Sequence, residues 1–210
     1  MARIASAAGT RLIVATPHNG AVIHPPELLF ELVVHFNAAL RHHGIELMVL
    51  VGAENVFNLG CDVMSRYCIN DTRYLLVEFP HTHLPNHASE IIFELLKAGL
   101  FPIIVHPERN PSIVREPKLL LELVAQGALA QITAESLTGT SGSAVKNCAR
   151  FLLKQGGVHF LASDGHSSTR RPPILSGGLK VATKLIGRQE ARKLVTDNPK
   201  RVLDGKPWPI

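Results

Sequence analysis

The sequence predicts one α/β domain, residues 1–210, in which parallel strands form a sheet or a barrel. Its length of 210 residues is enough for one sizeable hydrophobic core. Short apolar, β-branched runs alternate with longer segments of helical periodicity, which is typical of βα units. The runs are apolar on both faces, as expected for strands that helices cover on both sides of a sheet.

Strands are predicted where a short apolar run ends in a polar turn, and they are Thr10–Thr16, Glu46–Gly52, Arg73–Phe79, Phe101–Val105, Leu129–Thr133 and Val158–Ala162. Helices are predicted where apolar residues recur every three or four positions, with proline before some of them and glycine after others. They are Ala2–Ala8, Glu27–His43, His87–Ala98, Pro117–Ala125, Ser143–Gln155, Leu179–Ile186 and Gln189–Thr196. Pro199 is expected to lie beyond the last helix.

The composition excludes several classes of protein. With 46% hydrophobic and 19% charged residues, the chain is not expected to be disordered. No uncharged apolar run reaches the ~18 residues of a membrane helix, and the N-terminus lacks the pattern of a signal peptide. A cytoplasmic protein without membrane insertion is therefore expected.

The net charge of +5 is unevenly distributed. Residues 1–145 contain 9 Lys and Arg against 13 Asp and Glu, whereas residues 146–210 contain 13 against 4. A basic C-terminal third attracts phosphate, nucleic acid or acidic protein, although a solvated helical surface has the same composition. Aromatic residues are only 5% and do not alternate with the basic ones, so nucleic-acid binding is not expected.

The cysteines are Cys61, Cys68 and Cys148, an odd number without a C-x-x-C pair. This spacing argues against a disulfide framework and against a thiolate zinc site, and three reduced thiols are expected. None of them has an arginine six positions later. The phosphate-binding loop of a cysteine-dependent phosphatase is therefore absent.

Histidine and carboxylate residues follow five of the six predicted strands. The C-terminal ends of parallel strands form the active edge of barrels and open α/β sheets. Any one of these residues could be an ordinary loop residue, but their recurrence at one edge favours a metal site. Imidazole and carboxylate ligands without thiolate suit Mn, Zn or Fe, and several carboxylates suit two or more ions. The residues are His18, Glu54, Glu78, His81, His83, His106, Glu108, Asp164 and His166.

Two arginines lie close to these residues in the sequence. Arg109 follows the cluster His106-Pro-Glu108, and Arg171 follows Asp164 closely. Guanidinium groups bind phosphate oxygens in a bidentate manner, so arginine beside several metal ions indicates phosphoester hydrolysis. For the neighbouring Arg170 we expect a surface ion pair. The spacings of a P-loop, a dinucleotide-binding loop and a nucleophile elbow are absent.

The segments that carry these residues, taken in order, resemble the polymerase-and-histidinol-phosphatase (PHP) superfamily, and more closely its CpsB/CapC branch of capsule and exopolysaccharide tyrosine phosphatases. They are IVATPH18, VLVGAE54, NDTRYLLVE78FP, PIIVH106PE108R109N, GALAQITAESLTG139, VHFLASD164GH166 and R171PP. The resemblance spans nearly the whole chain and implies a distorted (β/α)7 barrel similar to a TIM barrel. It implies a cytoplasmic phosphoric monoester hydrolase that removes phosphate from tyrosine by a metal-activated hydroxide and so regulates polysaccharide synthesis.

The resemblance also implies roles for individual residues. Arg109 and Arg171 would bind phosphate, whereas Glu108 and His83 match family positions without an assigned role. The partner would be a tyrosine-phosphorylated protein, such as a bacterial tyrosine kinase of polysaccharide export. The metal would be Mn²⁺, two or three ions in the family, with Zn²⁺, Fe²⁺ or Co²⁺ as alternatives. The implied metal ligands are His18, Glu54, Glu78, His106, Asp164 and His166.

One family feature is missing from the printed sequence. Family members begin with a strand that carries a His-x-His pair, and both histidines bind metal. Here no histidine precedes His18, so roughly the first βα unit is expected to be absent. Either translation starts earlier than Met1, or the chain is a shortened form with fewer ions and weak activity.

Two other functions remain open at this level. One is a phosphatase of the same superfamily that acts on a small phosphomonoester such as histidinol phosphate. The other is a truncated, catalytically impaired module that binds an acidic partner through its basic C-terminal third.

Overall fold

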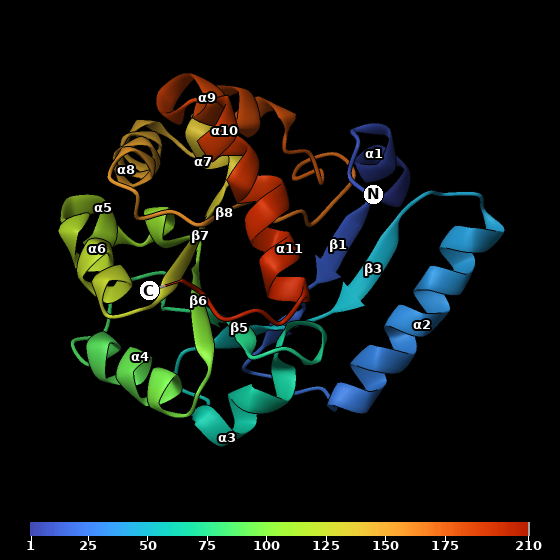
Figure 1. Cartoon of the computed structure of the whole chain (residues 1–210), viewed down its shortest axis with the longest axis horizontal. Coiled ribbons are helices and arrows are strands. Elements are labelled where there is room, and N and C mark those ends of the chain that lie inside the picture. Colours follow the sequence, from blue (N-terminus) through green and yellow to red (C-terminus); the bar gives the residue numbers. More distant parts are fainter. Residues whose placement is uncertain (210) are drawn as a thin grey trace.

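The computed structural model describes residues 1–209 and shows parallel strands enclosed by an outer ring of helices (Figure 1). Each of the six predicted strands appears as one strand, and two short strands that were not predicted, His18–Asn19 and Glu54–Val56, follow the first two. Pro17 lies just before the first of these, and proline has no N–H to donate to a strand neighbour. The strands are β1 (Leu12–Ala15), β2 (His18–Asn19), β3 (Met48–Val51), β4 (Glu54–Val56), β5 (Tyr74–Glu78), β6 (Phe101–Val105), β7 (Leu129–Thr133) and β8 (Phe160–Ala162).

Every strand pair is parallel. β1 pairs with β3, and the larger sheet has the order β2-β4-β5-β6-β7-β8, in which the strands from β4 to β8 follow one another as they do along the chain. Parallel neighbours require crossover connections, and here the crossovers carry the outer helices. The predicted α/β architecture with a barrel-like parallel sheet is therefore confirmed.

Each predicted helix has a counterpart in the structure, and further helices that were not predicted are Cys61–Met64, Pro111–Arg115, Ala134–Thr138 and Asn198–Leu203. The segment predicted as one helix over Gln189–Thr196 is wrong: α10 ends at Arg192, and Lys193–Asp197 forms a π-helical turn. Pro199 begins α11 instead of lying beyond the last helix, because proline is tolerated in a first helical turn where its N–H would have no partner. Within residues 1–209, no helix has both the length and the apolar character needed to cross a bilayer. The helices are α1 (Ala2–Ala7), α2 (Pro26–His42), α3 (Cys61–Met64), α4 (Ala88–Lys97), α5 (Pro111–Arg115), α6 (Lys118–Ala125), α7 (Ala134–Thr138), α8 (Ser143–Lys154), α9 (Ser176–Ile186), α10 (Arg188–Arg192) and α11 (Asn198–Leu203), with short 3₁₀ turns at Ser65–Tyr67, Ile69–Asp71 and Pro107–Arg109.

The inner face of the curved sheet has its own hydrophobic core. Leu76, Ile103 and Leu129 point inward and pack with Val202 of α11. Figure 1 shows α11 lying across the strands. The hydroxyl of Tyr74, the first residue of β5, donates to the carbonyl of Lys206 at 2.6 Å. The C-terminal segment thus covers the end of the sheet where the strands begin, and the opposite end remains available for a site.

The curved sheet is open on one side. Within residues 1–209, β8 pairs only with β7, and β1 pairs only with β3. A cavity of about 570 Å³ lies between these two strands, and its lining includes Leu12, Val14, Phe160 and Leu161. His18, Glu54 and Asp164 also line it. The open side therefore leads directly to the predicted metal ligands.

A buried histidine makes stability depend on pH. Burial lowers the pKa of His159 to about 4. Its Nδ1 accepts a hydrogen bond from the Ala130 N–H at 3.0 Å, which requires the neutral ring. Its edge contacts Trp208, with ring centroids 5.3 Å apart.

Because the unfolded chain takes up this proton near pH 6.5 and the folded chain does not, stability is expected to fall as the pH is lowered from 6.5 to 4, by up to about 3 kcal/mol. Urea unfolding followed by Trp208 fluorescence measures this loss. His159→Gln is expected to show a clearly shallower decline over the same interval. An equal decline in both proteins would contradict the assignment.

Candidate metal centre

The ends of the strands place the predicted ligands along one edge of the sheet. In the parallel register His18 is opposite Glu54, and Glu78 is the last residue of β5. His106 and Asp164 follow β6 and β8 with left-handed backbone angles, φ of 35° and 49°. Such angles are uncommon for residues other than glycine and concentrate at functional sites, where they aim a side chain that regular geometry would direct elsewhere.

Two buried amides hold the neighbouring strands in register. Asn19 Nδ2 donates to Asn55 Oδ1 at 2.8 Å, and Asn55 Nδ2 donates to the Leu76 carbonyl at 3.1 Å. Asn19 and Asn55 directly follow His18 and Glu54 in the sequence. These bonds therefore fix the spacing of the strands that carry both candidate ligands.

Four of the predicted ligands form a compact group. His18 Nδ1 lies 3.2 Å from Glu54 Oε1 and 3.7 Å from Glu78 Oε2. His106 Nε2 lies 3.5 Å from Oε1 of both carboxylates. Donor atoms of His18, Glu54 and Glu78 all lie within 4.8 Å of one another, close enough to share one ion.

The chemistry of this group fits a divalent cation. Glu54 is 5% exposed and Glu78 is 8% exposed. Within the described residues, the Oε1 atoms of both are buried without a hydrogen-bond partner. Burying two carboxylates side by side is unfavourable by several kcal/mol unless positive charge compensates, which is what a hard divalent ion would provide.

The pKa values of this group show the competition between burial and charge. Burial tends to raise the pKa of Glu54, but the contact with His106 and the charges of His106, His18 and His166 hold it below its usual value. Burial and the neighbouring Glu54 carboxylate raise the pKa of Glu78. Since metal ligands bind in their deprotonated form, cation binding here would release protons and weaken in acid.

Asp164 and His166 form a second group, next to the first. Asp164 Oδ2 accepts from Arg109 Nη1 at 2.6 Å and also from Arg171 Nη2. His166 Nδ1 lies 2.9 Å from the Asp164 carbonyl oxygen, and its ring centroid is 5.9 Å from that of His18. The structure thus brings both predicted phosphate-binding arginines to the predicted ligand Asp164.

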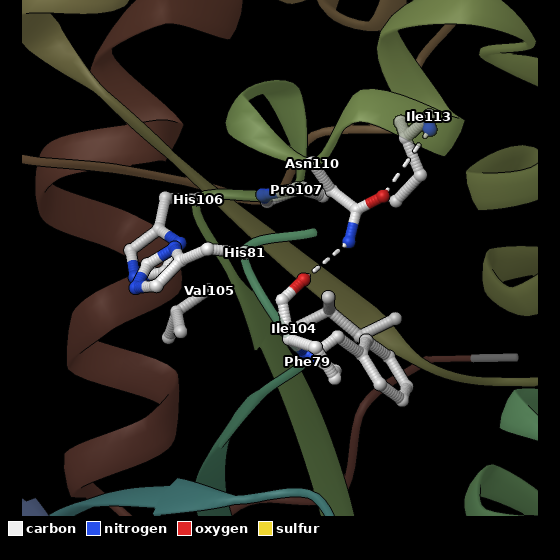
Figure 2. Close-up of a pocket in the computed structure, with 9 residues that line it drawn as sticks. Phe79, His81, Ile104, Val105, His106, Pro107, Asn110 and Ile113 are labelled. Atoms are coloured by element: carbon white, nitrogen blue, oxygen red, sulfur yellow. Dashed lines mark hydrogen bonds between the residues drawn. The ribbon is translucent and has the colours of Figure 1, made fainter. Parts of the chain in front are cut away.

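Sequence reasoning assigned no role to His81, which the structure places at the site. Its Nε2 lies 3.2 Å from Glu78 Oε1, and its ring stacks on that of His106 with centroids 5.8 Å apart (Figure 2). Asn110 Nδ2 donates to the Pro80 carbonyl at 2.9 Å, which fixes the loop that carries His81. The sequence did contain a signal for this position, because His81 lies three residues after Glu78, the last residue of β5.

The remaining polar residues of the motifs differ in their surroundings. His83 is exposed, and its Nδ1 lies 2.9 Å from its neighbour Thr82. Arg170 is exposed, and within residues 1–209 it forms no ion pair, so the expected surface ion pair is not found. Glu108 is completely buried and contacts Thr133, a residue that sequence reasoning did not select. Thr133 is the last residue of β7, but a threonine at a strand end is not by itself a sign of a site.

The cysteines lie in other parts of the fold as free thiols, Cys61 and Cys68 around α3 and Cys148 in α8. Burial raises the pKa of Cys68 to about 11 and that of Cys148 to about 12. Both are protonated at neutral pH, and a protonated thiol is a poor nucleophile. This agrees with the missing phosphatase loop in the sequence.

Comparisons with known proteins identify relatives of this chain. The family described as capsular polysaccharide synthesis, CpsB/CapC, matches residues 1–204. The tyrosine-protein phosphatase YwqE of Bacillus subtilis is 37% identical over 209 residues, which are 97% of this chain and 82% of that protein. The tyrosine-protein phosphatase CpsB of Streptococcus pneumoniae is 28% identical over 208 residues, 93% of this chain and 85% of that protein. A solved structure described as belonging to YwqE and CpsB, "unique metal-dependent tyrosine phosphatases", superposes with a TM-score of 0.91 at 36% identity and covers 99% of this chain and 86% of that one.

Proposed function

Because the chain belongs to the CpsB/CapC family of capsular polysaccharide synthesis, we propose that it is a metal-dependent phosphatase that hydrolyses phosphotyrosine in proteins. The observation that carries this proposal is a juxtaposition. Two buried carboxylates with imidazoles around them lie beside two arginines that meet at Asp164. Cations on one side and guanidinium groups on the other suit a phosphate dianion.

The proposed metal ligands are His18, Glu54, Glu78, His106, Asp164 and His166. Oxygen and imidazole donors favour Mn²⁺ and also accept Zn²⁺, Fe²⁺ or Co²⁺. When bound, such ions supply an activated water as nucleophile and neutralise charge on the phosphate. His18 presents 61% of its side chain to solvent, whereas Glu54 presents 7%. The group is therefore buried on the protein side and open on the side that a substrate approaches.

The chain's own residues bind and orient the phosphate in this proposal. Arg109 and Arg171 donate from positions that are only 22% and 34% exposed, where hydrogen bonds to a phosphate compete less with water. Asp164 holds both guanidinium groups together. As phosphate charge shifts during hydrolysis, these fixed donors stabilise it without reorganising.

The proposed substrate is a tyrosine-phosphorylated protein of polysaccharide export, such as a tyrosine kinase. The open position of His18 and of His81 supports access for a side chain that projects from a protein. The excess of basic residues in 146–210 supports attraction to an acidic, phosphorylated partner.

A chelator experiment tests the proposal. Phosphate release from a phosphotyrosyl peptide is expected to require Mn²⁺, to stop with excess chelator and to resume when Mn²⁺ is restored. Alkylation of the thiols is expected to leave the rate unchanged, because Cys68 and Cys148 are protonated and lie outside the site. Inactivation by alkylation at unchanged metal content would contradict the proposal.

Substrate comparison separates the proposal from its alternatives. A clearly higher kcat/KM for the phosphotyrosyl peptide than for histidinol phosphate is expected. The reverse preference would indicate a small-molecule phosphatase. Peptide binding without turnover, at any concentration of added Mn²⁺, would indicate a binding module.

A further inference from the structure

A buried network connects Arg109 to the interior of the protein. Arg109 Nη2 donates to Thr133 Oγ1 at 3.0 Å. Thr133 Oγ1 lies 3.0 Å from Glu108 Oε1 and 2.6 Å from Ser136 Oγ. Glu108, Thr133 and Ser136 are all 0% exposed. We propose that Thr133 and Glu108 are positioning residues that aim the Arg109 guanidinium at the phosphate.

The chemistry of the groups fixes the direction of every hydrogen bond in this network. A guanidinium can only donate, and Glu108 Oε1 serves as an acceptor because it also accepts from the Thr133 backbone N–H. The single proton of the Thr133 hydroxyl must therefore go to Glu108 Oε1, and its lone pairs face Arg109. Ser136 must then donate its own hydroxyl proton to Thr133 Oγ1. The arrangement has one consistent set of protons, so it presents an acceptor to Arg109 at a fixed point.

Glu108 is held as firmly as the hydroxyl that it orients. Its Oε1 also accepts from the Thr133 backbone N–H at 2.9 Å. This bond joins the turn after β6 to the end of β7, next to the left-handed turn at His106. The carboxylate thus contacts both the backbone and the side chain of Thr133, and Thr133 cannot turn its hydroxyl away from Arg109 without losing the bonds of that hydroxyl to Glu108 and Ser136.

Arg109 is therefore held from two sides. One Nη atom contacts Asp164 at 2.6 Å, and the other contacts Thr133. An incoming phosphate could replace the contact with Asp164, which lies at the site, whereas the contact with Thr133 lies inside the protein and persists. Glu108 and Thr133 would then keep the guanidinium plane oriented during the reaction, which is the value of a fixed donor.

Thr133→Val tests this inference, because valine has the shape of threonine without the hydroxyl. We expect kcat/KM for the phosphotyrosyl peptide to fall about tenfold, the size of one lost hydrogen bond to a charged group. Thr133→Ser keeps the hydroxyl and should restore the rate to within about twofold of the wild type. Thr138→Val, the same substitution at an exposed site in α7, should have no effect.

A double-mutant cycle separates positioning from general destabilisation. In an Arg109→Ala background, Thr133→Val is expected to have no further effect on kcat/KM, because the group that it positions is gone. Two effects that multiply would overturn the inference, as would wild-type activity of Thr133→Val itself.

The inference rests on the proposed function only through its activity assay, so a second measurement does not depend on turnover. NMR of the arginine side chains reports how fast the Arg109 guanidinium rotates. Slow rotation is expected in the wild type and in Thr133→Ser, and fast rotation in Thr133→Val. Equal rotation in all three would overturn the positioning role even if the enzyme is active, whereas an inactive wild type with the expected rotation would count against the proposed function alone.

Discussion

Replacing Glu54 with glutamine is expected to reduce phosphotyrosine hydrolysis by about a thousandfold or more, because it removes the charge at the centre of the candidate metal site. Glu54 Oε1 lies 3.2 Å from His18 and 3.5 Å from His106, so this one oxygen belongs to the surroundings of both imidazoles. Glutamine has nearly the same shape but lacks the negative charge that attracts a divalent ion. Turnover and bound metal should therefore fall together.

The same variant separates metal binding from folding. Without metal, Glu54 is a buried charge whose Oε1 has no hydrogen-bond partner in the described chain. Despite burial, the contact with His106 holds the Glu54 pKa below its usual value, so neutralising Glu54 should leave the melting temperature of the metal-free protein unchanged or slightly lower, whereas bound metal should be lost. Metal content is measured by elemental mass spectrometry, with Glu94→Gln on the exposed face of α4 as the matched control. A Glu54→Gln protein that keeps both its metal and its activity would show that the site lies elsewhere.

Arg171→Ala is expected to lower kcat/KM about a hundredfold while bound metal stays close to the wild-type amount. The reason is that Arg171 is proposed to donate hydrogen bonds to the phosphate and has no metal-binding atom, and the loss of one such donor typically reduces rates by about 10²–10³. Arg171→Lys keeps the charge but lacks the planar pair of donors, so it should recover only part of the activity.

The contact between Arg171 and Asp164 suggests a different role for Arg171, which the same measurements can detect. Arg171 Nη2 bonds to Asp164 Oδ2, and Arg109 Nη1 bonds to the same oxygen at 2.6 Å. If Arg171 mainly holds Asp164 in place for the metal, its removal will release metal and lower turnover in proportion. Parallel measurements of metal content and steady-state kinetics on one preparation distinguish the two roles.

The strands and the edge that carries the site could be predicted because both depend on local sequence. An apolar run such as Phe101–Val105 can hardly form anything but a buried strand, and whatever follows it must lie at the C-terminal edge of the sheet. His106 and Glu54 were therefore placed correctly relative to each other without knowledge of the connecting helices. Membership of the CpsB/CapC family, suggested by the same motifs, is confirmed by the comparisons.

Features that depend on contacts between distant residues could not be predicted in this way. The meeting of Arg109 with Arg171 at Asp164 requires the turns after β6 and β8 to lie side by side, which neither segment encodes alone. In the sequence, Thr133 resembles any β-branched strand residue, and only the structure shows its hydrogen bonds to Glu108. The prediction for Pro199 was wrong for a related reason, because proline is common both after the end of one helix and in the first turn of the next.

The open side of the sheet has a consequence for how the chain folds. Each strand pair joins neighbours along the chain, such as Glu54 with Leu76 in β4 and β5, or Leu12 with Met48 in β1 and β3. A closed barrel would also have to pair its first and last strands, the contact with the greatest loop-closure entropy. The pairings within residues 1–209 each span a single crossover, so this part of the sheet can grow one crossover at a time.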